Sequence, residues 1–305
     1  MKPHRTTLSV PGHRSNMHAK AAQSAADVVM LDLEDSVPIE AKEAARTTVA
    51  TALREIDWGR RLMAVRINAL QTPFAYRDLL HVAESAAPRI DTIVIPKVYS
   101  AADVHFVSRM LDGIELAEGI DTPIGIEASI ESAAGLTQIS KIAAASGRLK
   151  TLVFGIADYS ADVGARLVSI SGHGEDEDQL YPGHRWHFAM SRIVMAAKAA
   201  GLLAIDAPYG NFKDTQGLAR SASMACALGF DGKWAIHPTQ LDTINQIFSP
   251  SPADVGRARR VLEAHDAARK AGHGAAALEG RMIDQATVRL ARRTVEMARH
   301  LGMLE

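Results

Sequence analysis

Eight short apolar segments recur along the chain, and stretches with helical periodicity separate them. Most neighbouring segments lie roughly 25–35 residues apart, which is the spacing of β-strand–α-helix units. Regular alternation of strand and helix predicts a parallel sheet covered by helices. Eight repeats favour a closed (β/α)8 TIM barrel, an α/β fold, over an open doubly wound sheet. The predicted strands are Thr6–Val10, Asp27–Leu33, Leu62–Ile67, Thr92–Val98, Ile124–Ile130, Leu152–Ile156, Leu202–Ile205 and Gly232–Ile236.

The pattern changes after Pro250. Two amphipathic helices are expected over residues 252–272 and 285–301, and the Gly- and Ala-rich segment 272–280 joins them as a hinge. We therefore predict a catalytic barrel domain over residues 1–249 and a C-terminal helical tail, able to act as a lid, over residues 250–305. Between the sixth and seventh strands, residues 164–187 carry the acidic run Glu175–Asp178 and are expected to form a surface loop.

Composition narrows the class of protein. The 305 residues suit a barrel with an extension, and 47% apolar residues allow a large core. The formal net charge of −1 argues against nucleic acid as a partner. Cys226 is the only cysteine, which excludes an internal disulfide and a cysteine-rich zinc site. Because the sequence shows neither a secretory signal nor a spanning apolar stretch, we expect a cytoplasmic protein without a membrane partner.

Ionisable residues follow nearly every predicted strand. In a barrel of this type the catalytic groups lie at the carboxyl ends of the strands, on one face. So many charges at a barrel mouth would be costly unless they bound ions or substrate. The residues in question are Asp32, Glu34, Asp35, Arg66, Lys97, Glu131, Asp158, Asp206 and His237.

The fifth predicted strand is the most informative. Because side chains alternate between the two faces, Glu127, Ser129 and Glu131 should all point toward the barrel axis. Two carboxylates on the inner face of one strand need a cation or a proton. Asp158, after the next strand, supplies a third oxygen-donor group. Oxygen donors without a thiolate or an H-x-H pattern nearby favour Mg²⁺ or Mn²⁺ over Zn²⁺.

Each of these residues also has a structural interpretation. A strand-end acid is often the N-cap of the following helix, and Asp35 and Asp214 are the clearest candidates. Arg66 and Lys97 could pair with structural acids, and His237 could be a structural histidine. Only the whole set favours a catalytic site. The chain has no phosphate loop, zinc-protease, serine-hydrolase or dinucleotide-binding motif.

The ordered motifs closely resemble those of the citrate lyase β-subunit-like family, within the HpcH/HpaI aldolase superfamily, which includes malyl-CoA and citramalyl-CoA lyases. The resemblance covers nearly the whole chain. Residues 206–214 with 232–238 look most like malyl-CoA and β-methylmalyl-CoA lyases, and residues 280–284 resemble the C-terminal motif. The remaining matching motifs are Ser9–Gly12, Asp32–Val37, Val65–Asn68, Ile95–Val98, Ile130–Leu136 and Phe154–Tyr159.

The resemblance implies roles for individual residues. Glu131 and Asp158 would bind Mg²⁺, with Mn²⁺ as a substitute, and Arg66 would contact the oxygen on which negative charge develops. Asp284 would move the proton at the acetyl carbon, in the site of a neighbouring subunit. The sequence departs from the family at His13-Arg14, where many relatives have a smaller residue after the glycine. The expected substrate- and CoA-binding residues are Arg5, Arg14, Lys20, Glu34, Asp35 and Lys97.

The implied activity is a Mg²⁺-dependent carbon–carbon lyase. It would cleave, or form, a short 3-hydroxyacyl-CoA such as malyl-CoA or β-methylmalyl-CoA, with glyoxylate as the second product, in a homotrimer or homohexamer. A citramalyl-CoA or citryl-CoA lyase would fit the same resemblance. The residues also leave open a metal-dependent class II 2-oxoacid aldolase, a Schiff-base aldolase using Lys97 or Lys233, and a non-catalytic CoA-binding subunit. EDTA would inactivate the metal aldolase and spare the Schiff-base enzyme.

Overall fold

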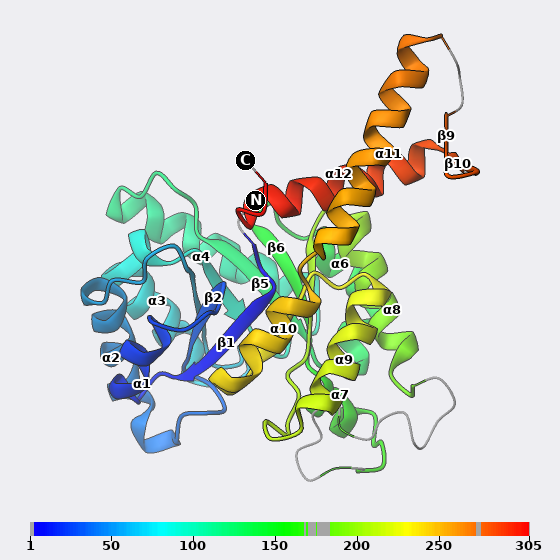
Figure 1. Ribbon diagram of the computed structural model, residues 1–305. Coiled ribbons are helices and arrows are strands. Elements are labelled where there is room, and N and C mark those ends of the chain that lie inside the picture. The colour runs from blue at the N-terminus through cyan, green and yellow to red at the C-terminus, as the bar shows by residue number, and fades with distance from the viewer. Residues whose placement is uncertain (1–2, 168, 170–174, 176–183, 273–275, 305) are drawn as a thin grey trace. The chain divides into compact units, whose positions relative to one another are not determined.

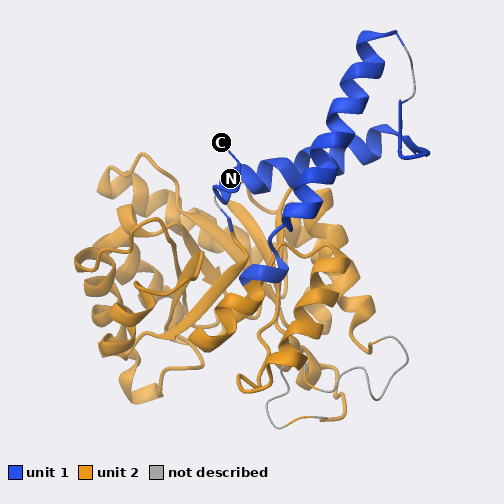
Figure 2. Cartoon of the chain, in the orientation of Figure 1, with its two compact units in different colours: residues 1–3, 245–305 blue, residues 4–244 orange. Residues whose placement is uncertain are grey.

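The computed structural model describes residues 3–167, 169, 175, 184–272 and 276–304. The chain forms two compact units (Figure 2). One comprises residues 4–244, and the other comprises residues 1–3 and 245–305. This division falls a few residues before the predicted domain boundary after residue 249.

The larger unit is a closed barrel of eight parallel strands (Figure 1). Each strand pairs with the next along the chain, and β8 pairs with β1 to complete the ring. The predicted (β/α)8 fold is therefore confirmed. The strands are β1 Thr6–Pro11, β2 Val28–Asp32, β3 Leu62–Arg66, β4 Thr92–Ile95, β5 Gly125–Ile130, β6 Leu149–Phe154, β7 Leu203–Asp206 and β8 Gly232–Ala235.

Helices follow the strands and cover the outside of the barrel (Figure 1). A capping box at Ser100 and Asp103 starts the longest of them, α4, and Gly119 ends it in the left-handed conformation. The helices of the barrel are α1 Ser15–Ala21, α2 Lys42–Glu55, α3 Ala75–Ala86, α4 Ala101–Glu118, α5 Ala133–Thr137, α6 Ile139–Ala143, α7 Ile156–Asp162, α8 His187–Ala199, α9 Thr215–Leu228 and α10 Leu241–Ile247, with 3-10 turns η1 Ile39–Ala41, η2 Ala87–Arg89 and η3 Pro238–Gln240.

The strands are buried on both faces, which explains their continuous apolar sequence. Inward-facing side chains from several strands, among them Met30, Val94 and Ile205, form one cluster inside the barrel. Outward-facing neighbours such as Leu31 and Ile93 are equally buried. Burying each such side chain stabilises the fold by about 1.5–3 kcal/mol relative to leaving it exposed. The side-chain alternation predicted for β5 is confirmed at Glu127, which lies opposite inward-facing Val94.

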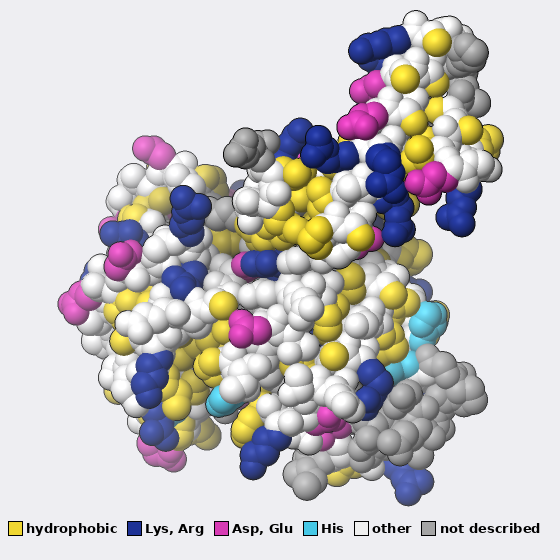
Figure 3. All heavy atoms as spheres, in the orientation of Figure 1, with side chains coloured by type: hydrophobic (Ala, Val, Ile, Leu, Met, Phe, Trp, Pro, Cys, Tyr) yellow, Lys and Arg dark blue, Asp and Glu magenta, His cyan; other side chains and the backbone are white. Residues whose placement is uncertain are grey.

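The smaller unit contains the two predicted tail helices, α11 Pro252–Lys270 and α12 Gln285–His300. A capping box at Ser251 and Asp254 starts α11. The described part of the expected hinge contains β9 Ala276–Leu278, which forms an antiparallel hairpin with β10 Arg281–Ile283 just after the hinge. Its apolar side chains join both helices in one small core, which is why the hairpin is ordered. Arginines on α11 and α12 give this unit the basic surface visible in Figure 3.

Most of the predicted surface loop lies outside the described residues, including the acidic positions Asp176, Glu177 and Asp178. Within the described part of the chain, no helix combines the length and the apolar character needed to cross a bilayer.

Candidate active site

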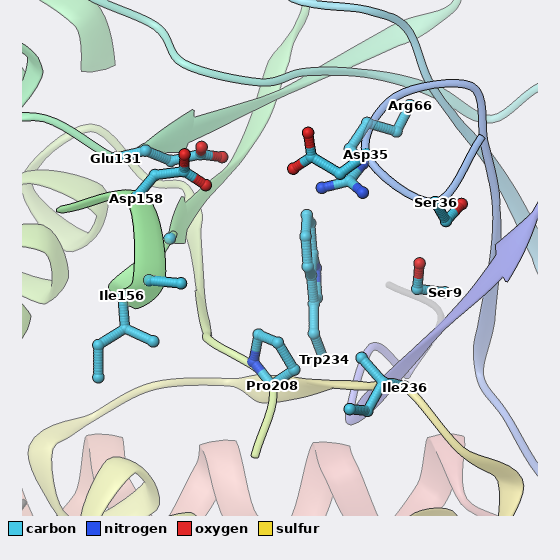
Figure 4. Close-up of a pocket in the computed structure, with 12 residues that line it drawn as sticks. Ser9, Asp35, Ser36, Arg66, Glu131, Ile156, Asp158, Pro208, Trp234 and Ile236 are labelled. Atoms are coloured by element: carbon cyan, nitrogen blue, oxygen red, sulfur yellow. The ribbon is translucent and has the colours of Figure 1, made fainter. Parts of the chain in front are cut away.

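A cavity of about 310 Å³ opens at the carboxyl ends of the strands (Figure 4). It brings together four of the residues predicted for the site, namely Asp35, Arg66, Glu131 and Asp158. The remaining lining residues are Ser9, Ser36, Gly155, Ile156, Ala157, Pro208, Trp234 and Ile236. The apolar wall and the few charged groups are typical of a small-molecule site.

The position of Glu131 depends on a glycine in the neighbouring turn. Glu131 follows the last residue of β5 and is 5% exposed. A Cβ atom at Gly155 would lie 2.2 Å from Glu131 Cγ, so any larger residue there would displace the carboxylate. Asp158 lies in the first turn of α7, just beyond that glycine. Ser132, not Glu131, caps α5, because its hydroxyl accepts a hydrogen bond from the Gly135 amide at 3.0 Å.

The electrostatics of Glu131 favour a bound cation. Burial, together with the negative charges of Glu34 and Asp158, raises the pKa of Glu131 to about 8 against the opposing effect of Arg66. A cation between these carboxylates would relieve both the burial cost and the repulsion. No cluster of three or more His, Cys, Asp or Glu ligands occurs among the described residues. Two carboxylates fit Mg²⁺, which usually keeps several positions for water and substrate oxygens.

Arg66 is held in place by the carboxylate of Asp32. Its Nε and Nη2 atoms donate to Asp32 Oδ1 and Oδ2 at 2.6 and 2.8 Å, and Nη1 lies 3.2 Å from Glu34 Oε2. The guanidinium also lies 5.6 Å from the centre of the Trp234 ring. Since arginine has five N–H donors, this arrangement fixes its plane and leaves donors for a ligand in the cavity.

Asp32 is a strand-end acid to which sequence reasoning assigned no role in the site. It is fully buried, and it accepts hydrogen bonds from the amides of Glu34 and Ser36 as well as from Arg66. Burial raises its pKa, but Arg66 and these hydrogen bonds outweigh that effect and lower it to about 2. One signal was available, because alternation places Asp32 on the same inward face as Val28 and Met30.

Lys97 connects acids from two sides of the cavity. Its Nζ lies 2.8 Å from Glu34 Oε1, 3.4 Å from Asp35 Oδ1 and 3.7 Å from Asp158 Oδ1. Its φ of 50° is left-handed, a strained conformation for a residue other than glycine. Burial lowers the pKa of Lys97, but the hydrogen bond and charge of Glu34 raise it above its usual value overall. Burial raises the pKa of Glu34.

Of the six predicted substrate- and CoA-binding residues, only Asp35 lines the cavity. Glu34 and Lys97 lie beside it, since they contact the lining residues Arg66 and Asp158, and the other three lie elsewhere. Arg5 precedes β1 and forms a two-pronged pair with Asp27 at 2.7 and 2.8 Å, at the barrel end opposite the cavity. Its place in the fold therefore does not support the prediction for Arg5, because its guanidinium already joins the starts of β1 and β2. Arg14 and Lys20 are exposed at the start and near the end of α1, which follows β1 on the cavity side.

Asp284 belongs to the smaller unit. It is exposed and caps α12, accepting hydrogen bonds from the Thr287 amide and hydroxyl at 2.7 and 2.8 Å. The hydrogen bond from the Thr287 amide is the main cause of a lowered pKa at Asp284. The capping interpretation thus holds within one chain, and a role in a neighbouring subunit's site stays a prediction.

Two of the residues expected at the mouth, Asp206 and His237, do not line the cavity. Lys233 and Asp206 form a buried ion pair at 2.5 Å on the outward faces of β8 and β7. Their neighbours Trp234 and Ile205 point inward, so alternation turns this pair toward the helices. His237 caps η3 and stacks on Phe212 with ring centres 4.8 Å apart, which is a structural role.

Comparison with known proteins relates this geometry to a family. The chain is 42% identical over 302 residues to L-malyl-CoA/β-methylmalyl-CoA lyase of Cereibacter sphaeroides, covering 97% of this chain and 95% of that protein. It is 33% identical to malyl-CoA/β-methylmalyl-CoA/citramalyl-CoA lyase of Chloroflexus aurantiacus, covering 99% and 90%. The CitE protein of Mycobacterium tuberculosis, solved with magnesium, acetoacetate and coenzyme A, matches with a TM-score of 0.77 and 33% identity over 97% and 98% of the two chains. Residues 5–238 match the family model described as HpcH/HpaI aldolase/citrate lyase, and the chain belongs to that family.

Proposed function

We propose that this protein is a Mg²⁺-dependent lyase that cleaves, or forms, the carbon–carbon bond of a short 3-hydroxyacyl-CoA. Malyl-CoA and β-methylmalyl-CoA are the expected substrates, with glyoxylate as the 2-oxoacid product. The observation that carries this proposal is the cavity in which Glu131 and Asp158 face Arg66. The relatives from Cereibacter and Chloroflexus, whose names include both substrates, support it over nearly the whole chain.

The carboxylates of Glu131 and Asp158 would hold the metal. When bound, Mg²⁺ supplies Lewis-acid polarisation of the substrate oxygens, and Mn²⁺ is expected to substitute for it. Gly155 keeps Glu131 against the β6–α7 turn, so both carboxylates face the cavity. The apolar side chains of Ile156 and Pro208 limit the water around these charges, which strengthens their interactions.

Arg66 would stabilise the charge that develops during bond cleavage. When the substrate hydroxyl gives its proton to a base and becomes the carbonyl of glyoxylate, the bond between the two halves of the substrate breaks and its electron pair moves onto the thioester carbonyl as an enolate. A guanidinium fixed in advance by Asp32 would meet that oxygen without reorganising, which is the strategy of an oxyanion hole. An acid must then protonate the enolate carbon, and Asp284 of a neighbouring subunit is the candidate.

The charge state of the lysines argues against a Schiff-base aldolase. A lysine that forms a Schiff base must lose its proton, so such enzymes lower its pKa. Lys97 instead has a raised pKa among three carboxylates, and Lys233 is paired with Asp206 outside the cavity. A non-catalytic CoA-binding subunit would gain nothing from the buried charges around Arg66.

A substrate panel would test the proposal directly. The purified protein should release acyl-CoA and glyoxylate from malyl-CoA and β-methylmalyl-CoA in the presence of Mg²⁺, and EDTA should stop the reaction. Citramalyl-CoA and citryl-CoA belong in the same panel, because the Chloroflexus relative is also named for citramalyl-CoA. Turnover that persists in EDTA would rule out the metal-dependent reaction.

Asp32 is proposed to position Arg66. Asp32→Asn keeps the shape of the side chain but weakens its hydrogen bonds to the Arg66 guanidinium. We therefore expect kcat to fall by about 10-fold or more with little change in KM. Asp78→Asn is the matched control. Asp78 is paired with buried Arg46, whose Nε lies 2.6 Å from Asp78 Oδ1, and neither residue lines the cavity. That control should lose stability and keep its kcat. Similar kcat values for both variants would show that Asp32 is only structural.

The Asp32 pair should also stabilise the fold in a pH-dependent way. The pKa of Asp32 is lowered from 3.8 to about 2 in the folded protein, so the pair contributes to the free energy of unfolding at pH values above the unfolded pKa. The contribution is lost as the pH falls through the folded pKa. The difference in free energy of unfolding between the native protein and Asp32→Asn should therefore shrink between about pH 4 and pH 2, which denaturant titration would measure.

Asp284 is proposed to complete the site of a neighbouring subunit in a homotrimer or homohexamer. Asp284→Ala and Asp158→Ala should each be inactive as pure oligomers. After reversible dissociation and mixing, a minority of the native activity should return, because some sites then combine an intact barrel with an intact tail. If mixed subunits exchange and remain inactive, Asp284 acts only in its own chain or only as a helix cap.

The contact with CoA is proposed to involve exposed basic residues on and beside α1. Arg14 stands in the turn that follows β1 on the mouth side of the barrel and Lys20 is exposed farther along α1, whereas the Arg5 side chain is held by Asp27. Replacing both by glutamine should raise the KM for CoA thioesters and leave kcat nearly unchanged. Steady-state kinetics with malyl-CoA would measure this, and an unchanged KM would remove both residues from the CoA site.

A further inference from the structure

One side of the barrel interior is polar. The inward positions of β5 and β6 hold Glu127, Ser129 and Thr151, where barrels usually carry branched apolar side chains. All three side chains are fully buried, with 0% exposed. An apolar cluster that includes Met30 and Val153 fills the rest of the interior. The polar side chains therefore lie inside the protein, deeper than the catalytic cavity, which they do not line.

Three oxygen atoms of this group have no partner among the described residues. Glu127 Oε1 accepts a hydrogen bond from the Thr92 hydroxyl at 2.8 Å and lies 4.0 Å from His4 Nε2. Glu127 Oε2, Ser129 Oγ and Thr151 Oγ1 are buried without a hydrogen-bond partner in the described structure. Glu127 and Thr151 are direct neighbours across β5 and β6, and Ser129 is the next inward residue on β5. The three oxygens consequently face one region of the interior.

Unpaired buried polar atoms are costly and rare in native proteins, so this cluster needs a ligand. A carboxylate oxygen only accepts hydrogen bonds, whereas a hydroxyl can donate or accept. Water satisfies both kinds of partner, and buried water typically makes about three hydrogen bonds.

We propose that the barrel interior contains ordered water bound by Glu127 Oε2, Ser129 Oγ and Thr151 Oγ1. This water would join β5 to β6 on their inner faces, below the position where Glu131 leaves β5. It would be a structural part of the barrel, because none of its ligands lines the catalytic cavity. The inference does not depend on the proposed reaction.

The sign of one stability change tests the proposal. Thr151→Val keeps the shape of the side chain and removes only the hydroxyl. If water is bound, it loses a partner, and Tm should fall by about 2–4 °C. If the interior is dry, the change removes an unpaired buried hydroxyl, and Tm should stay the same or rise. Because Thr151 is outside the cavity, kcat should not change. Calorimetry on the full chain would measure Tm.

A control and a second variant keep the experiment decisive. Val65→Thr places a new hydroxyl at a fully buried position of β3 between apolar Leu31 and Ile93, so its Tm must fall in either case. Ser129→Ala should lower Tm in the same way as Thr151→Val, and it replaces that variant if Thr151→Val does not fold. A Tm that is unchanged or raised in these hydroxyl deletions, alongside a lowered Tm in the control, would overturn the proposal.

A crystal structure of the native protein at high resolution gives the direct readout. The proposal expects a density peak about 2.7–3.2 Å from at least two of the three oxygens, and its loss or displacement in Thr151→Val. An empty interior, or a protein donor bound to Glu127 Oε2, would contradict it. A peak with several ligands at about 2.3–2.6 Å would identify a cation instead and would equally reject water.

Discussion

Replacing either Glu131 or Asp158 by alanine should abolish turnover and weaken Mg²⁺ binding while the barrel remains folded. Each change removes one of the two carboxylates proposed to hold the metal in the cavity. Removing Glu131 also relieves a buried, repelled charge, so its variant should be no less stable than the native protein without Mg²⁺. Isothermal titration with Mg²⁺ would measure the binding, and coupled detection of glyoxylate would measure the turnover.

Asp162→Ala is the matched control for these variants. Asp162 lies on α7, as Asp158 does, but its carboxylate accepts a hydrogen bond from the Ala133 amide at 2.7 Å and does not line the cavity. Its variant should keep both Mg²⁺ binding and turnover. Full activity of Asp158→Ala in EDTA would reject the assignment of these residues to a metal site.

Arg66→Lys should reduce kcat on the order of 10²-fold or more, comparable to the loss of one oxyanion-hole donor. Lysine keeps the positive charge but cannot form the planar fork that Asp32 holds. The effect should fall on kcat more than on KM, because the lost interaction is strongest with the charge that develops during cleavage. Initial-rate measurements across a range of malyl-CoA concentrations would provide both kcat and KM.

The matched control for Arg66 is Arg46→Lys. Arg46 is buried and paired with Asp78 between α2 and α3, so its variant reports the general cost of replacing a buried, paired arginine. We expect that variant to be less stable and catalytically normal. A near-native kcat in Arg66→Lys would show that the role of Arg66 is structural. It would not test whether Glu131 binds the metal, which the Mg²⁺ titration measures.

The variants also distinguish the residues that line the cavity from the residues that position them. Asp32 and Lys97 contact the charged groups of the cavity, but Glu131, Asp158 and Arg66 line it directly. Loss of the metal ligands should remove activity entirely, whereas loss of Asp32 should leave a measurable remainder. This graded result is expected because a poorly oriented guanidinium still carries its charge.

Sequence alone determined the fold and the identity of the main cavity residues. Eight apolar segments at regular spacing favour a parallel barrel, since each strand must be buried on both faces. Period-two alternation along β5 then placed Glu127 and Glu131 on the inner face, and the structure agrees at Glu127. Position at the carboxyl end of a strand placed Arg66 and Asp158 among the candidates, because parallel strands bring these ends together, but it equally selected Asp206 and His237, which do not line the cavity.

Only the tertiary structure decided which charged residues pair with one another. Asp32 on β2 holds Arg66 on β3 through a hydrogen-bonded ion pair. Lys233 points away from the cavity, where it forms a buried ion pair with Asp206. Arg5, near the start of the chain, lies at the opposite end of the barrel beside Asp27. Such pairings depend on distances between residues far apart in sequence and on burial, neither of which local periodicity contains. Local pattern fixes the face of a strand, and packing selects the partner.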